Sequence, residues 1–211
     1  MATKIDSVLS TQLSSSFDEE TARSEIYGLL ASVLYTSPAT EIIAQIRASA
    51  TETPAAGAFL EEPWRNFVGV TRSMPDQAIK NEYEALFGGV GKPEIYLYGS
   101  HYLSGFLNEK PLARLRTDLN SLGLERSEVM SDTEDHFAYL CEVMRYLIAG
   151  DDVVVANLTR QREFFSTHMQ PWVNLMCDDI QSNAKAKFYA SLADLIRAFM
   201  GVEAQGFDML V

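Results

Sequence analysis

Apolar residues recur at intervals of three and four along almost the whole chain, and runs that alternate at a period of two are nearly absent. The clearest case precedes Gly150, where the apolar positions are Phe137, Leu140, Cys141, Met144, Leu147 and Ile148. Side chains at this spacing lie on one face of an α-helix, and glycine is common just after a helix end. The pattern predicts an all-α protein.

Turn-forming residues divide this pattern into separate helices. The segments that we expect to be helical are 17–36, 38–46, 64–68, 75–87, 111–122, 131–149, 153–165, 172–180 and 188–199. They predict a single bundle-like domain of about nine or more helices over residues 17–205. We expect a flexible N-terminus at residues 1–16, a short tail at 206–211, and a hinge in either 88–110 or 123–131.

The least regular segment, residues 88–110, is rich in glycine and aromatic residues. Loops of this kind provide specific backbone geometry more often than core packing requires. Two interpretations of its tyrosines, and of Tyr83 before it, are open. They form either an aromatic core in which the hydroxyls have hydrogen-bond partners or the wall of a peptide groove. Gly91 and Lys92 do not form a phosphate loop, because Leu86 stands where that motif needs glycine and Pro93 follows the lysine.

Residues 131–137, Ser-Asp-Thr-Glu-Asp-His-Phe, open the strongest predicted helix with acidic residues and a histidine. In one interpretation Ser131 and Glu134 form a capping box, and the two aspartates favour the positive end of the helix. That interpretation leaves His136 unexplained, because an imidazolium is disfavoured at the same end. A neutral ring would serve there as a hydrogen-bonding group, so a helix cap and a binding site both remain open.

Charge and cysteine content narrow the class of protein. The 211 residues include 17 Lys and Arg against 29 Asp and Glu, a net charge of −12 that repels nucleic acid and anionic lipid and favours a basic peptide as partner. The first 16 residues lack the apolar core of a signal peptide, and no run of about 18 apolar residues occurs. We expect a cytoplasmic protein without membrane insertion, with Cys141 and Cys177 as core residues rather than a disulfide.

Catalytic and metal sites are poorly supported. The three histidines, His101, His136 and His168, lack the paired spacing of metal ligands. Asp135 and His136 with Ser131 or Ser100 imitate a nucleophile and its base, but no GxSxG elbow accompanies them. We therefore expect no metal and no catalytic residue.

Five ordered motifs carry a resemblance to a known family. They are Y-E-A-L-F at 83–87, Y-G-S-H-Y-L at 98–103, E-D-H-F at 134–137, H-M-Q-P-W at 168–172 and F-Y-A-S-L-A at 188–193. Over roughly residues 20–205 the chain resembles the TorD/DmsD/NarJ redox-enzyme maturation chaperones. The resemblance implies an all-helical, non-catalytic protein that binds the twin-arginine signal peptide of a molybdenum-cofactor enzyme and holds the apoenzyme until the cofactor is inserted.

The resemblance also implies a leader-binding pocket. Its residues would be Tyr83, Leu86, Phe87, Tyr98, Gly99, Ser100, Tyr102, Glu134, Asp135 and His136, with Trp64, Pro171 and Trp172 as a secondary set. Asp135, supported by Glu134, is the predicted acceptor of an arginine, because a carboxylate matches a guanidinium with two parallel hydrogen bonds. Thr133 departs from the proline that relatives often have there, which bears on the identity of the partner.

Two other functions remain open from the sequence. One is an assembly factor that binds the mature part of a respiratory enzyme subunit and never contacts a signal peptide. The other is an enzyme that uses Asp135 and His136. Weak nucleotide binding is compatible with the acidic and aromatic composition of the predicted pocket, and both a monomer and a domain-swapped dimer are compatible with the glycine-rich hinges.

Overall fold

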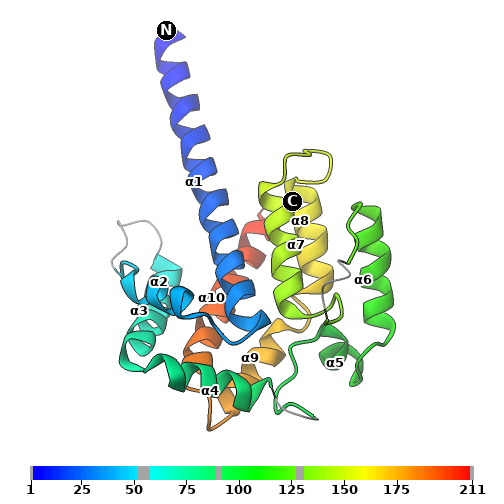
Figure 1. Ribbon diagram of the computed structural model, residues 1–211. Helices are drawn as coiled ribbons and strands as arrows, with labels where there is room; N and C mark the ends of the chain where they lie inside the picture. Colours follow the sequence, from blue (N-terminus) through cyan, green and yellow to red (C-terminus); the bar gives the residue numbers. More distant parts are fainter. Residues whose placement is uncertain (1, 52–57, 89–91, 127–130, 210–211) are drawn as a thin grey trace.

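The computed structural model describes residues 2–51, 58–88, 92–126 and 131–209, with side chains for 19–51, 60–88, 92–126 and 131–209. Within these residues it contains ten helices and no β-strand, which confirms the predicted all-α class (Figure 1). The helices are α1 (Ala2–Tyr35), α2 (Thr40–Ala48), α3 (Ala58–Ser73), α4 (Asp76–Leu86), α5 (Gly99–Ser104), α6 (Lys110–Ser121), α7 (Phe137–Ala149), α8 (Leu158–His168), α9 (Val173–Ser182) and α10 (Phe188–Asp208). Over the described residues, no helix combines the length and apolar character needed to cross a membrane.

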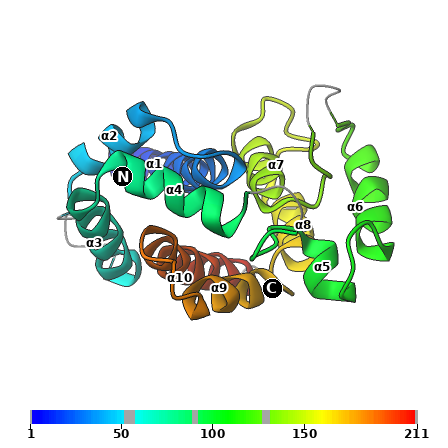
Figure 2. The same ribbon diagram turned by 60° about the horizontal axis from the view of Figure 1, so that its bottom comes forward.

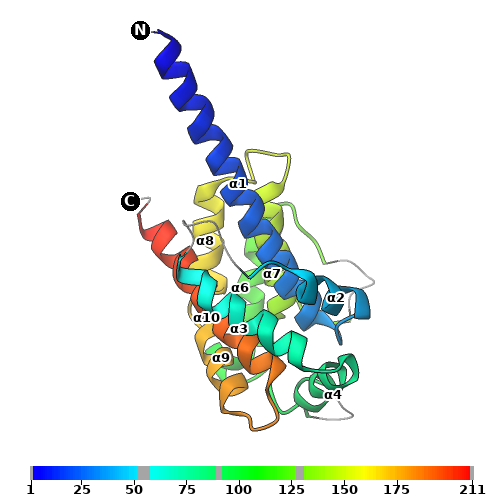
Figure 3. The same cartoon turned by 90° about the vertical axis from the view of Figure 1, so that its left-hand side faces the viewer.

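Two helices organise the packing. α1 lies along α7, while α10 contacts α3, α4 and α9. Figure 2 shows α1 to α4 and α10 grouped on one side, with α5 to α8 on the other. The N-terminal turns of α1 project beyond the other helices in both Figure 1 and Figure 3. The C-terminal turns of α1 are therefore the part that joins the two groups.

The predicted apolar faces form the core. All six apolar positions predicted on α7 are buried, and Cys141 and Cys177 are buried free thiols as expected. Leu175, an apolar residue within the predicted helix 172–180, is an exception, since it is 48% exposed. The inner face of α9 is formed instead by Met176, Cys177 and Ile180.

Several helix ends differ from the predictions. The backbone is already helical at Ser16, so the predicted start of the first helix there is wrong. α8 begins at Leu158, because the Asn157 side chain caps it by accepting the N–H of Arg160. α10 continues to Asp208, into the predicted tail, because Phe207 is buried against Phe165. The two predicted hinges include residues 89–91 and 127–130, which lie outside the described residues.

A buried carboxylate fixes α4 against α10. Glu82 on α4 accepts the backbone N–H groups of Lys187, Phe188 and Tyr189 at 2.8, 3.1 and 2.8 Å. These N–H groups belong to the first turn of α10, where a helix has no internal acceptors and where its dipole favours negative charge. The contact holds α4, and with it Tyr83, in a defined position.

Candidate functional site

Two regions singled out by the sequence cross each other in the structure. The Phe137 N–H donates to the Leu97 carbonyl at 2.7 Å, and the Gly99 N–H donates to the Asp135 carbonyl at 2.9 Å. Between these bonds Tyr98 and His136 form an isolated antiparallel bridge. The aromatic segment before α5 is therefore joined directly to the acidic turn before α7.

One cavity, of about 250 Å³, lies on the side of this crossing toward which Tyr98 and His136 project. We call it the aromatic cavity, and its lining residues are Tyr35, Tyr83, Phe87, Pro93, Ile95, Tyr96, Leu97, Tyr98, Leu107, Asp132 and His136. It brings together four of the predicted site residues, Tyr83, Phe87, Tyr98 and His136. Its walls come from α1, α4 and the two crossing segments.

Hydrogen bonds and ring contacts fix the aromatic walls. The Tyr83 hydroxyl donates to the backbone carbonyl of Tyr35 at 2.9 Å, and the Tyr83 ring meets Phe87 edge-on. The Tyr98 hydroxyl donates to Asp132 Oδ1 at 2.5 Å, and the Tyr98 ring meets His136 edge-on at a centroid distance of 5.0 Å. The hydroxyls of Tyr83 and Tyr98 thus already have partners, which leaves the faces and edges of these two rings for an apolar ligand.

Carboxylates act on Tyr83 and Tyr98 in this cavity, and one ammonium, that of Lys92, lies 6.0 Å from the centroid of the Tyr96 ring. Burial raises the pKa of Tyr83 to about 12, and the carboxylates of Glu84 and Asp132 contribute to the same shift. Burial and the hydrogen bond to Asp132 also raise the pKa of Tyr98 well above its ordinary value. Both phenols are therefore neutral donors at pH 7, and the field around them favours a cation.

His136 is the N-cap of α7. Its Nδ1 accepts the N–H of Ala138 at 3.2 Å, and α7 begins one residue later at Phe137. Burial lowers its pKa to about 4, although Asp132 and Asp135 act in the opposite direction. The prediction of a neutral, hydrogen-bonding ring is confirmed. The predicted capping box is wrong: Glu134 pairs with Arg116 and the helix starts after the acidic turn instead of within it.

Asp135 faces away from the aromatic cavity and is buried. Its Oδ2 accepts the N–H of Ser100 at 2.8 Å in the first turn of α5, and its Oδ1 accepts the hydroxyl of Thr133 at 2.6 Å. The carboxylate therefore caps α5 from 35 residues away. Its role as an acceptor for a leader arginine stays a prediction, and the structure gives it a structural role in addition.

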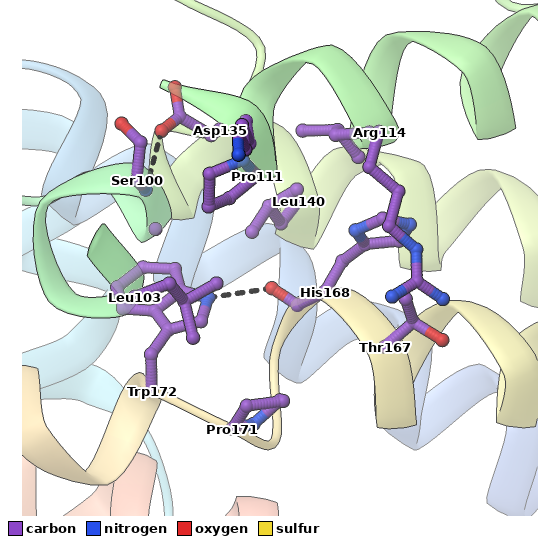
Figure 4. Close-up of a pocket in the computed structure, with 13 residues that line it drawn as sticks. Ser100, Leu103, Pro111, Arg114, Asp135, Leu140, Thr167, His168, Pro171 and Trp172 are labelled. Atoms are coloured by element: carbon purple, nitrogen blue, oxygen red, sulfur yellow. Dashed lines mark hydrogen bonds between the residues drawn. The ribbon is translucent and has the colours of Figure 1, made fainter. Parts of the chain in front are cut away.

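A second cavity has a volume of about 360 Å³ (Figure 4). Five further predicted site residues line it: Gly99, Ser100, Asp135, Pro171 and Trp172. Trp172 is fully buried, as expected of a core residue, and its indole N–H donates to the backbone carbonyl of His168 at 2.6 Å. The crossing of the two segments thus separates the predicted site residues into two neighbouring cavities.

Gly99 is required by the close approach of this tryptophan. A Cβ at Gly99 would lie 3.0 Å from Trp172 Nε1 and 3.1 Å from Cε2, which is closer than normal packing allows. Gly99→Ala is expected to lower the free energy of unfolding by about 1–3 kcal/mol, measured by urea denaturation. Gly201→Ala on α10 is the control, because nothing lies within 4 Å of its added Cβ and alanine favours a helix. Equal effects of the two changes would contradict this account of Gly99.

Four predicted residues line neither cavity. Leu86 is fully buried in the core, and Glu134 is occupied by Arg116. Tyr102 stacks on Trp172 at 5.5 Å and hydrogen-bonds Asp179. The fourth, Trp64, lies on α3 and donates to the Ala50 carbonyl. Sequence reasoning did not assign Tyr35 or Asp132 to the site, since Tyr35 merely precedes a helix break and Asp132 resembled a helix-end acid.

Comparison with known proteins identifies the family. Residues 53–178, which include both crossing segments, match the model of the family described as nitrate reductase delta subunit. The chain belongs to the nitrate reductase delta subunit family. Two curated relatives, each named "Chaperone protein TorD" and from Vibrio cholerae serotype O1 strains M66-2 and O395, are 23% identical over 205 residues. Each match covers 90% of this chain and 93% of the relative, and the family resemblance seen in the motifs is confirmed.

In this member of the nitrate reductase delta subunit family, Ser100 and Ser131 are not arranged as nucleophiles with His136 as their base. Ser100 meets Asp135 through its backbone N–H, and its Oγ accepts the N–H of Asn108. The Oγ of Ser131 donates to Asp132. In the described part of the chain, neither serine hydroxyl is hydrogen-bonded to His136, so no proton relay connects these residues.

Proposed function

We propose that this protein is a non-catalytic cytoplasmic chaperone that binds the twin-arginine leader of a molybdenum-cofactor oxidoreductase precursor and holds the apoenzyme before export. Membership of the nitrate reductase delta subunit family and the chaperone names of two relatives support the class. The aromatic cavity is the observation that carries the proposal. A twin-arginine leader joins a basic end to an apolar segment, and this cavity offers acidic and apolar groups side by side.

Asp132 is the residue best placed to receive an arginine. Its carboxylate lies at the edge of the aromatic cavity and is half-buried. One oxygen accepts the Tyr98 hydroxyl and the other accepts the Ser131 hydroxyl at 3.1 Å, so lone pairs remain on both. A guanidinium can pair with such a carboxylate through two hydrogen bonds, which a lysine cannot reproduce.

The apolar part of the leader would cover the rings. Tyr83 on α4, Phe87 at the C-cap of α4 and Leu107 after α5 supply apolar surface to the cavity. Burial of apolar side chains against them contributes roughly 25 cal/mol for each Å² removed from water, and this term would supply most of the affinity. His136 is neutral and does not repel the arginines at pH 7.

Asp132→Asn is expected to weaken binding of a twin-arginine leader peptide by about 1.5–3 kcal/mol, or roughly 10- to 150-fold in Kd. The amide keeps the shape of the side chain and an acceptor for Tyr98 while it removes the charge. Calorimetric titration measures the change. Asp151→Asn is the matched control, because Asp151 is exposed beyond the far end of α7, about 20 Å along the helix from His136. Equal affinity of the two variants would contradict the role of Asp132.

Asp135→Ala is a less direct test of the same proposal. It is also expected to weaken leader binding, since Asp135 is a predicted arginine acceptor. However, the change removes the hydrogen bond by which Asp135 caps α5, and this same bond joins the two crossing segments. A loss of binding in that variant would combine two causes, whereas Asp132→Asn leaves the Asp135 contacts in place.

A further inference from the structure

The second cavity is not used by the arginine site, and its interior is apolar. Leu115, Leu140 and Trp172 contribute buried side chains to it. Figure 4 shows Pro111 and Pro171 on opposite sides of this space, and the Leu103 side chain overlaps the Trp172 ring in this view. The cavity is large enough for one or two apolar side chains of a peptide.

Two cations on one helix, α6, line this cavity, in contrast to the net charge of the protein. Lys110 and Arg114 lie one helical turn apart on α6, and both line the cavity while exposed to solvent. The carboxylate nearest to Arg114 is Asp118 at 4.0 Å, and that carboxylate also contacts His168 Nε2 at 2.8 Å. In the described part of the chain Lys110 has no ion pair.

The carboxylate in the cavity wall is not paired with these cations. Asp135 is the one acidic residue among the described lining residues, and it forms no ion pair with Lys110 or Arg114 there. Because both cations are exposed, they are available to an anionic group that enters from solvent. A carboxylate in contact with both side chains would form two charge-assisted hydrogen bonds in place of its hydrogen bonds to water.

The segment 103–107 carries exposed apolar side chains and contributes one residue to each cavity, and we call it the apolar ridge. Leu107 lines the aromatic cavity and Leu103 lines the second one, and Phe106 between them is 71% exposed. Left-handed backbone conformations at Gly105 and Asn108, with φ of 79° and 61°, form the turn that presents Phe106. A peptide that follows this ridge passes from an acidic site, across apolar surface, to a basic one.

We propose that the second cavity is a further peptide subsite, which holds an apolar side chain of the client beside an aspartate or glutamate that pairs with Lys110 and Arg114. The proposal rests on the proposed function, since the client segment is the one that continues from the leader arginines. The proposal fixes the orientation of the bound peptide: its arginines lie at Asp132, and its carboxylate lies at Lys110 and Arg114 on α6.

The experiment uses the full chain and a probe that lacks arginine, acetyl-Leu-Leu-Glu-amide, with acetyl-Leu-Leu-Lys-amide as its matched control. The chain has two tryptophans, and the indole N–H signal of Trp172 reports on this cavity while that of Trp64 reports elsewhere. In NMR titrations the glutamate probe is expected to shift the Trp172 signal saturably, with about tenfold higher affinity than the lysine probe, and to leave Trp64 unchanged.

Charge reversal on α6 completes the test. The double variant Lys110→Glu, Arg114→Glu is expected to reverse the preference between the two probes, and an unchanged Trp64 signal shows that the fold persists. If that variant fails to fold, Lys110→Gln, Arg114→Gln replaces it and is expected to abolish the preference. No Trp172 shift with the glutamate probe, or equal affinity for both probes, would overturn the proposal. Because neither probe contains arginine, this result is separate from the outcome of leader titrations.

Discussion

Glu82→Ala is expected to lower the free energy of unfolding by about 3 kcal/mol or more. The Glu82 carboxylate accepts three backbone N–H groups at the start of α10. Among the described helices only α1 is longer than α10. Removal leaves these donors without a protein partner at a buried helix end and removes a negative charge that the helix dipole favours. Hydrogen bonds to a charged group contribute more than neutral ones, which makes the expected loss large.

Urea denaturation of three variants tests this expectation. Glu84→Ala is the control, because Glu84 lies on the same helix and is exposed. It is expected to change stability by less than about 0.5 kcal/mol. Glu82→Gln keeps one acceptor oxygen and is expected to fall between the two. A Glu82→Ala protein as stable as the Glu84→Ala protein would show that the contact between α4 and α10 does not depend on this carboxylate.

The free energy of unfolding is also expected to fall steeply as the pH is lowered, because of His136. Burial holds the pKa of this ring at about 4 in the folded protein, compared with 6.5 in an unfolded chain. Between pH 6.5 and 4 the unfolded state therefore binds a proton that the folded state does not, so acidification favours unfolding. At 1.36 kcal/mol for each pKa unit, this histidine accounts for about 3 kcal/mol of lost stability at pH 4 relative to pH 7.

The variant His136→Asn isolates this contribution. Asparagine does not titrate and is a good N-cap, so it retains an acceptor for the Ala138 N–H. Denaturant unfolding at pH 7 and pH 4 is expected to show a loss about 3 kcal/mol smaller in the variant than in the wild-type protein. Carboxylates titrate in both proteins, so they contribute little to the difference. The same loss in both would mean that His136 is not buried as a neutral ring.

Local patterns predicted the fold well. The spacing of Phe137, Leu140 and Met144 is a direct consequence of helix geometry, and each of these residues is buried on α7. Helix ends were harder, because acidic residues before a helix are compatible with a start at Ser131 or after His136. The choice depends on the crossing with Leu97: residues 133–136 form a hydrogen-bonded turn, and His136 then has extended backbone and is the cap.

The arrangement of the site depended on contacts that no local pattern encodes. The bonds from Tyr83 to Tyr35 and from Ser100 to Asp135 join residues 48 and 35 positions apart. The family motifs contain four of the residues that line the aromatic cavity and seven of those that line the second cavity, but they did not show that the crossing divides them between two cavities. They also did not separate Asp135, which is buried and lines the second cavity, from Asp132, which is half-buried and lines the aromatic cavity.

Calorimetric titration of the purified protein with twin-arginine leader peptides tests the central claim most directly. Each peptide is compared with a version in which both arginines are replaced by lysine. The account predicts a Kd in the micromolar range or tighter, weakened at least tenfold by the lysine replacement and by Asp132→Asn. Absence of binding across a panel of leaders, together with binding to a precursor that lacks its leader, would contradict the account and favour an assembly factor for the mature subunit.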